Sequence, residues 1–141
     1  MKKERNNKGF SLVELIVVVL IMGIIAVALA PQVMKWVGTA RENSDNNQAK
    51  TIQSTVQGAV ADWQSRNSVP DDADAVYKIG GASNTLDITH DWGATGDLLS
   101  TVIDEYMGGD FPKPQTADVF TVTITKGTGK VTVTIGAPAG T

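Results

Sequence analysis

The first half of the chain carries two kinds of hydrophobic pattern, and the first is a continuous run. From Phe10 to Ala30, 21 consecutive residues are almost all apolar, which is close to the ~20 residues that a helix needs to cross the hydrocarbon core of a bilayer. The run is apolar on every side, as expected of a helix embedded in lipid. The pattern predicts a membrane-spanning helix that contains a single carboxylate, Glu14.

The second pattern is periodic. Farther along the chain, apolar residues recur at spacings of three and four, which predicts one hydrophobic stripe on a helix that packs against a folded domain. The polar segment 41–48 lies between the two patterns, and we interpret it as helix that is exposed to solvent or to neighbouring subunits. We expect one helix from Phe10 to near Arg66–Asn67, ending before Pro70. The stripe consists of Ala49, Ile52, Val56, Ala59, Val60 and Trp63.

Strict alternation of apolar and polar residues appears near the C-terminal end. Residues 120–125 and 131–135 alternate and are separated by a segment with two glycines, which predicts a β-hairpin. One register places every apolar side chain on the same face, and the threonines then point outward. In that register Ile124 faces Val131, Val122 faces Val133 and Phe120 faces Ile135.

The middle of the chain gives weaker signals. A strand pair is expected at 76–79 and 86–89, around Gly80–Gly81. A short helix is expected at 98–106, with Asp97 near its start and Gly108–Gly109 as its stop. The hairpin must bury its apolar face, and the helical stripe is the available partner. The predicted fold class is therefore α+β, with a long N-terminal α-helix packed on a small antiparallel β-sheet.

The charge is distributed unevenly along the chain. Residues 1–9 hold four basic side chains against one acidic one, whereas the remaining residues hold 8 basic against 14 acidic. Basic residues before an apolar run place the N-terminus on the cytoplasmic side of a membrane. The acidic remainder argues against a nucleic-acid partner, which would require clustered lysine and arginine. The chain has no cysteine, so an exported domain must rely on its core rather than on disulfides.

Glu14 calls for a partner, because a carboxylate in a membrane helix costs ~2.5–3.5 kcal/mol near the centre on insertion scales, and somewhat less near an end, where Glu14 lies. No lysine or arginine lies within the apolar run. If the chain were cut after Gly9, the new α-amino group of Phe10 would lie about one helical turn from Glu14, or beside Glu14 of an adjacent copy. Gly9 has no side chain, so a protease can approach the backbone closely.

The stretch from Lys8–Gly9 through Phe10–Ser11–Leu12–Val13–Glu14 resembles the N-terminus of a type IV prepilin, with its class III signal peptide. The resemblance covers about residues 5–37. It implies that a membrane-bound prepilin peptidase cuts between Gly9 and Phe10 and N-methylates Phe10. It also implies that Glu14 takes part in subunit assembly and sets the register between packed helices. Because it has no cysteine, the chain most resembles the cysteine-free type IV pilins of Gram-positive bacteria.

The resemblance further implies a structural role and no enzymatic one, with no cofactor. The protein would be a subunit, in our interpretation the major pilin, of a homopolymeric type IV pilus. Its other partners would be the pilus assembly machinery and, before assembly, the cytoplasmic membrane, with the head outside the cell. Gly23 and Pro31 would be weak points that let the helix melt locally in the fibre. The expected divisions are a leader at 1–9, a membrane and polymerisation helix at 10–31, an amphipathic continuation at 32–67 and a head at 68–141.

Three alternatives follow from the same residues. Ala28–Leu29–Ala30 fits a secretory cleavage pattern, but the apolar run exceeds the usual ~7–15 residues, and Pro31 would then follow the cut. A type II secretion pseudopilin is the second alternative, although the calcium-binding loop common in major pseudopilins is not evident. A minor pilin or tip adhesin is the third. Glu14 favours polymerisation within a fibre, because some tip subunits lack this residue.

Two polar clusters in the head were considered as sites. Asp71, Asp72 and Asp74 offer oxygen ligands for calcium, but their spacing lacks the glycine and final glutamate of an EF-hand loop, so a solvated surface is favoured. His90–Asp91–Trp92 contains the only histidine, without a serine or cysteine nucleophile motif. We interpret this tripeptide as a structural element of a loop, or at most a surface recognition patch, and we predict no catalytic or metal site.

Overall fold

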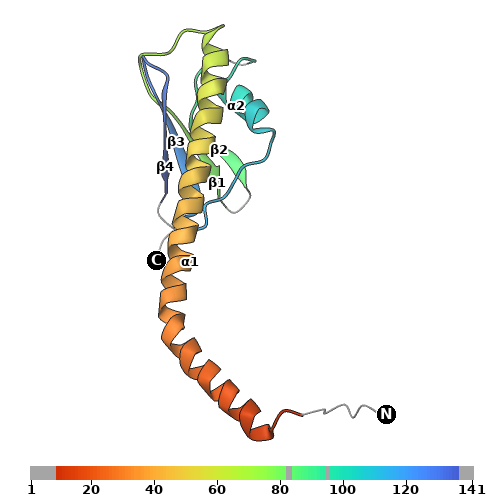
Figure 1. Ribbon diagram of the computed structural model, residues 1–141. Helices are drawn as coiled ribbons and strands as arrows, with labels where there is room; N and C mark the ends of the chain where they lie inside the picture. The colour runs from red at the N-terminus through yellow and green to blue at the C-terminus, as the bar shows by residue number, and fades with distance from the viewer. Residues whose placement is uncertain (1–8, 82–83, 95, 137–141) are drawn as a thin grey trace, which may run out of the picture. The chain divides into compact units, whose positions relative to one another are not determined.

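A computed structural model describes residues 9–81, 84–94 and 96–136. Helix α1 runs from Leu12 to Gln64, and the chain divides into two compact units, residues 1–39 and 40–141. The second unit is the head, in which four strands and helix α2 accompany the C-terminal part of α1 (Figure 1). The strands are β1 (Ala75–Gly80), β2 (Thr85–His90), β3 (Val119–Thr125) and β4 (Lys130–Ile135), and α2 spans Leu99–Met107.

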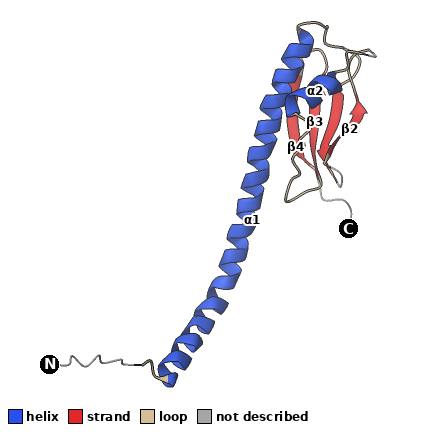
Figure 2. Cartoon of the chain, turned by 90° about the vertical axis from the view of Figure 1, so that its right-hand side faces the viewer, coloured by secondary structure: helices blue, strands red, loops and turns tan. Residues whose placement is uncertain are grey.

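The sheet is antiparallel throughout, with strand order β2-β1-β3-β4 (Figure 2). The hairpin register predicted from the sequence is confirmed, since all three apolar pairs form between β3 and β4. The weak strand pair is also confirmed as β1 and β2. The predicted α+β fold, a long N-terminal helix packed on a small antiparallel sheet, is therefore correct.

One face of the sheet is covered by helices. The stripe on α1 and the apolar side of α2 pack against the same strand positions, those that alternate inward along β1 and β3. Trp63 ends the stripe, and its ring centroid lies 6.2 Å from that of Trp92. Both indole N–H groups are satisfied, by the carbonyls of Asp97 and Ala73 at 2.9 Å. The core includes Ile52, Val56, Val60, Tyr77, Ile79, Leu99, Ile103, Phe120, Val122 and Ile124.

Two glutamines of α1 form hydrogen bonds with the backbone of the last strand and of the turn before it. Gln53 donates from Nε2 to the carbonyl of Val131 at 3.1 Å, and the N–H of Val131 donates to Oε1 of Gln57 at 3.2 Å. Gln57 also donates from Nε2 to the carbonyl of Gly129 at 3.3 Å. These groups of Val131 lie at the outer edge of the sheet, because β4 is its last strand among the residues that the structure describes. The helix thus supplies hydrogen bonds that a fifth strand would otherwise make.

Helix α1 begins at Leu12 rather than at the predicted Phe10, and its last regular residue is Gln64, two residues before the predicted Arg66–Asn67.

Helix α2 ends as expected, because Gly108 adopts a left-handed conformation (φ 66°) that permits its C-cap. Asp97 lies near the start of α2 but does not cap it. Its carboxylate instead accepts hydrogen bonds from Asn67 at 2.7 Å and Arg66 at 3.3 Å.

The expectation that segment 41–48 is exposed is wrong at Asp45, which is completely buried. Its carboxylate accepts hydrogen bonds from the backbone N–H of Gln115 (2.7 Å) and from both the N–H (2.8 Å) and the hydroxyl (2.6 Å) of Thr116. Burial raises the pKa of such a carboxyl, but these hydrogen bonds outweigh it and hold the pKa of Asp45 below its usual value. Asp45 therefore ties the loop before β3 to α1.

Asp91 has the structural role foreseen for His90–Asp91–Trp92. One carboxylate oxygen accepts hydrogen bonds from the hydroxyl of Tyr77 and from the N–H groups of Trp92 (2.9 Å) and Ser100 (3.1 Å). The bond to Ser100 satisfies a free N–H group in the first turn of α2. Burial, followed by the hydrogen bond to Asp91, raises the pKa of Tyr77. Tyr77 is therefore a neutral donor at physiological pH, and Asp91 links β1 to α2.

A fragment that begins at Lys35 is expected to be soluble and monomeric, because the stripe, the sheet and α2 all lie within residues 40–141. Sedimentation velocity should give the same monomer mass at several concentrations, and heating should give one cooperative transition. Concentration-dependent association, or melting without cooperativity, would show that the core of the head needs the preceding helix.

Candidate processing and assembly segment

The residues predicted for processing lie before α1, outside any helix or strand. Gly9 and Phe10 are outside the helix and exposed, and Phe10 is 89% exposed. A Cβ placed on Gly9 would meet nothing within 4 Å. The bond between Gly9 and Phe10 is therefore open to an enzyme that binds an extended peptide and approaches the small residue closely.

Ser11 marks the start of the helix and has a role that the sequence prediction did not include. Its carbonyl accepts the first helical hydrogen bond, from the N–H of Leu15 at 3.2 Å. Ser11 and Glu14 have the Ser-x-x-Glu spacing of a capping box, in which each side chain satisfies a free N–H group at the helix start. That spacing is the signal that could have placed the helix start at Leu12 rather than Phe10.

Glu14 lies in the first turn of α1. A negative side chain there is favoured by the helix dipole, because the free N–H groups of the first turn carry partial positive charge. Among the described residues both ion pairs involve Arg66, with Asp62 and Asp97 as its partners. Glu14 thus has no charged partner within the described part of the chain.

The apolar part of α1 is exposed on all sides. Every large apolar residue from Leu12 to Val37 is at least 44% exposed. By length and composition α1 can cross a membrane. A surface of this size does not stay in water, since soluble proteins rarely expose contiguous apolar patches beyond a few hundred Å². It requires either hydrocarbon or the matching surfaces of other helices.

The predicted weak points lie within this part of α1. The helix continues through Gly23 and Pro31 without a break. Pro31 has no N–H group, so the carbonyl of Val27 lacks its usual helical donor. A Cβ on Gly23 would meet nothing within 4 Å, so the glycine is not required by packing within this chain. The structure brings Gly9, Phe10 and Glu14 into one short segment and places Gly23 and Pro31 farther along the same helix.

Three acidic residues of the head, Asp71, Asp72 and Asp74, are the candidate calcium ligands of the sequence. Among the described residues, no group of three or more histidine, cysteine, aspartate or glutamate side chains is placed to hold a metal ion. Asp71 and Asp72 are exposed, as expected of a solvated surface. Asp74 has a structural role, because its carboxylate accepts a hydrogen bond from the N–H of Lys126 at 2.9 Å, in the β3–β4 turn.

A long helix that is apolar at its start and packs its later part on a small antiparallel sheet is the architecture of a pilin-like subunit. Comparison with known proteins agrees with this class. Residues 5–30 match the prokaryotic N-terminal methylation motif. The chain is 31% identical over 133 residues to the prepilin peptidase-dependent protein A of Clostridium perfringens (strain 13 / Type A), covering 94% of this chain and 88% of that relative. No solved structure matches significantly.

The chain belongs to the pilin-like prepilin family, whose members are structural proteins and not enzymes. The resemblance to a type IV prepilin without cysteine is thereby confirmed. The hydrophobic N-terminal helix is consistent with membrane anchoring of such a protein.

Proposed function

We propose that this protein is the major structural subunit of a type IV pilus. The observation that carries the proposal is a helix exposed on all its apolar sides, with one carboxylate in its first turn and an accessible Gly9–Phe10 bond before it. A plain membrane anchor needs the apolar side chains but gains nothing from Glu14, which is costly in lipid. In a polymer of such helices, the apolar side chains pack against one another and Glu14 can pair with the amine of a neighbouring copy.

In this proposal a prepilin peptidase cuts after Gly9 on the cytoplasmic side and methylates the amino group of Phe10. The family motif at residues 5–30 and the printed name of the Clostridium relative support this step. The mature subunit then waits in the cytoplasmic membrane with its head outside, and the assembly machinery moves it into an extracellular fibre. There the Phe10 amine of one copy pairs with Glu14 of a neighbour.

The pair of the Phe10 amine and the Glu14 carboxylate would set the axial offset between neighbouring helices. Within a dry bundle of apolar helices, packing alone permits several axial offsets between neighbours. An unpaired buried charge costs about 3–5 kcal/mol, so the offset that brings the amine to the carboxylate is favoured over the rest. Gly23 and Pro31 would allow the helix to loosen between these fixed points when the fibre is stretched.

Mature subunits are expected to begin with N-methyl-Phe10, because Gly9 is the small residue at the junction between the basic leader and the helix. Intact-mass measurement of subunits from purified fibres checks both the cleavage position and the methyl group. A mature N-terminus at Pro31 would overturn the proposal in favour of secretory cleavage after Ala30.

Electron microscopy of sheared surface fibres, combined with mass spectrometry of their main component, tests the role of major pilin. Long fibres composed mainly of this chain are expected. Fibres in which the chain is a trace component would instead indicate a minor pilin or tip adhesin, and short fibres that form only with an active secretion system would indicate a pseudopilin.

A further inference from the structure

The two edges of the sheet differ in how their backbone groups are satisfied. At the β4 edge, Gln53 and Gln57 bond to the outward N–H and carbonyl of Val131. At the other edge, β2 is the outermost strand (Figure 2). Within the described part of the chain, no other segment bonds to the side of β2 that faces away from β1. The outward backbone groups of β2 are therefore available to an additional strand.

A groove of about 390 Å³ lies beside this open edge, between β2 and α2. Leu86 and Ile88 of β2 line it. Their partners in β1 are the buried Ile79 and Tyr77, so all four side chains share the face of the sheet that the helices cover. Ile88 is nonetheless 49% exposed. The sheet therefore carries apolar surface at its edge that α2 leaves uncovered.

The opposite wall of this groove comes from α2 and from the segment that follows it. It comprises Ser100, Thr101, Asp104 and Phe111. Asp104 is exposed, and it is the one charged residue that lines the groove within the described part of the chain. The groove is thus apolar along the sheet and negative at its α2 rim, which favours an occupant that combines apolar side chains with positive charge.

The other face of the β2 edge is polar and also acidic. Thr85, Asp87 and Thr89 alternate with the groove residues along the strand and are exposed. Asp87 lies opposite Lys78 of β1 in the register, yet both ion pairs among the described residues involve Arg66, so Asp87 takes part in neither. A basic residue on a strand added beyond β2 would therefore find an opposite charge beside it.

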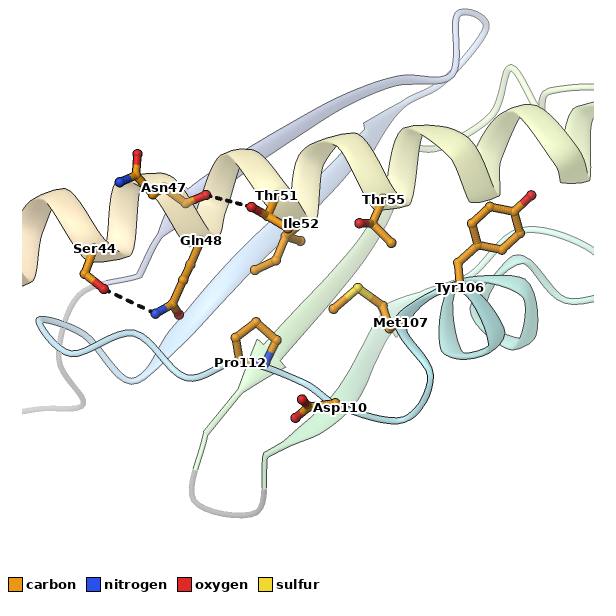
Figure 3. A pocket seen from close by; sticks show the side chains of 10 residues that line it. All are labelled: Ser44, Asn47, Gln48, Thr51, Ile52, Thr55, Tyr106, Met107, Asp110 and Pro112. Carbon is orange, nitrogen blue, oxygen red and sulfur yellow. Dashed lines mark hydrogen bonds between the residues drawn. The ribbon is translucent and has the colours of Figure 1, made fainter.

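A larger groove of about 470 Å³ lies beside α1, between that helix and the segment that follows α2 (Figure 3). There, polar side chains of α1 bond within the helix. Nε2 of Gln48 donates to Oγ of Ser44 at 3.4 Å, and the hydroxyl of Thr51 donates to the carbonyl of Asn47 at 3.1 Å. None of the residues that line this groove belongs to a strand. Of the two grooves, the one beside β2 therefore combines apolar surface with an open strand edge.

We propose that the β2 edge binds an extended segment of another protein, with apolar side chains at every second position and basic side chains between them. The segment adds to the sheet as a fifth strand, in which backbone hydrogen bonds to β2 give affinity and the alternating side chains give specificity. Its apolar side faces Ile88 and α2, and its basic side lies next to Asp87. A second copy of β2 fits this edge poorly, because pairing two β2 strands would bring both Asp87 carboxylates to one face of the joined sheet.

Hydrogen–deuterium exchange of the full-length chain in uncharged detergent micelles tests this site. The probe is a soluble peptide of about seven alternating lysine and valine residues, a length within the usual range of a strand. With free peptide at about ten times its Kd, exchange of the outward N–H groups of β2 is expected to slow about tenfold, because only the unoccupied molecules exchange. Exchange within β4, whose outer edge is held by α1, should not change.

A methylated peptide and two variants of the chain are the matched controls. The same peptide with every backbone nitrogen methylated keeps its side chains and charge but donates no backbone hydrogen bond, so fluorescence anisotropy should show binding at least about tenfold weaker. Ile88→Lys should weaken binding of the unmethylated peptide by a similar factor, because it places a positive charge on the apolar side of the groove. Thr132→Lys makes the same change of charge at an exposed position of β4 and should leave binding unchanged.

Unchanged exchange within β2, or equal binding of the methylated peptide, would overturn the site. Protection of β2 that appears without peptide and rises with protein concentration would also overturn it, since a second copy would then cover the edge. The exchange experiment uses the wild-type chain, so it gives an answer even where Ile88→Lys prevents folding. The fibre experiments do not involve the β2 edge, so each of these results would leave the pilus function standing.

Discussion

Replacing Glu14 with alanine is expected to block fibre growth while leaving membrane insertion and cleavage after Gly9 largely intact. The change makes the helix more apolar, so insertion should if anything improve. In the proposed processing step, cleavage occurs at the Gly9–Phe10 bond, which precedes the first turn of α1. What is lost is the partner of the Phe10 amine, which leaves an unsatisfied cation among apolar helices. Electron microscopy should show no fibres, and mass spectrometry of membranes should show processed subunits.

Glu14→Gln is the sharper control, because it keeps the shape and the hydrogen-bonding capacity of the side chain and deletes only its charge. If the glutamine variant assembles normally, the register depends on hydrogen bonding or packing rather than on an ion pair. Normal fibres from Glu14→Ala would exclude Glu14 from assembly altogether. Accumulation of uncleaved Glu14→Ala chains would mean that the residue acts at processing instead.

Asp45→Ala is expected to lower the free energy of unfolding of the head by about 2–3 kcal/mol, the range for a hydrogen-bonded charged group. The substitution leaves three donors of Gln115 and Thr116 without their acceptor, and the loop before β3 loses its attachment to α1. Denaturant unfolding of the fragment that begins at Lys35 measures the effect. Asp62→Ala is the matched control, since Asp62 is an exposed helix carboxylate whose side chain is 47% accessible, and its loss should cost little.

The contribution of Asp45 should depend on pH in a defined direction. Its pKa is lower in the folded head than in the unfolded chain, so its stabilising effect is present above the unfolded pKa of about 3.9. The effect is lost as the pH falls through the lower folded pKa. The difference in stability between the wild-type head and Asp45→Ala should therefore be constant near neutral pH and shrink below about pH 4. A difference that stays constant into strong acid would contradict this account of Asp45.

The elements that the sequence predicts well are those with a clear period. The stripe on α1 identified the core face of the helix because residues three and four apart share one side. The alternation in the hairpin determined its register, since a slip of one residue would turn every apolar side chain to solvent. Gly108 marked the end of α2 because it takes a conformation that other residues avoid.

Asp45 could not be found in the same way. Its partners Gln115 and Thr116 are 70 and 71 residues away, and nothing local distinguishes it from its polar neighbours. One signal was available in hindsight: Asp45 lies four residues before Ala49 and seven before Ile52, on the continuation of the stripe. A polar residue on the buried side of a helix predicts a buried hydrogen-bond network rather than an exposed face.

The processing segment was recognisable because its chemistry is local. Gly9, Phe10 and Glu14 lie within a few residues of one another and directly follow the basic residues, so the motif can be read from their order along the chain. The groove beside α1 could not be foreseen, because its two walls come from distant parts of the sequence and meet only through the tertiary fold.

The glutamines that hold Val131 have a consequence for crowding. In the proposed fibre, heads would stand at high local concentration, and a sheet with an open edge is a template for unwanted strand pairing between molecules. Because Gln53 and Gln57 occupy the outward N–H and carbonyl of Val131, β4 cannot offer those groups to the sheet of another head. The same contacts that anchor the last strand therefore also act against strand pairing at this edge of the sheet.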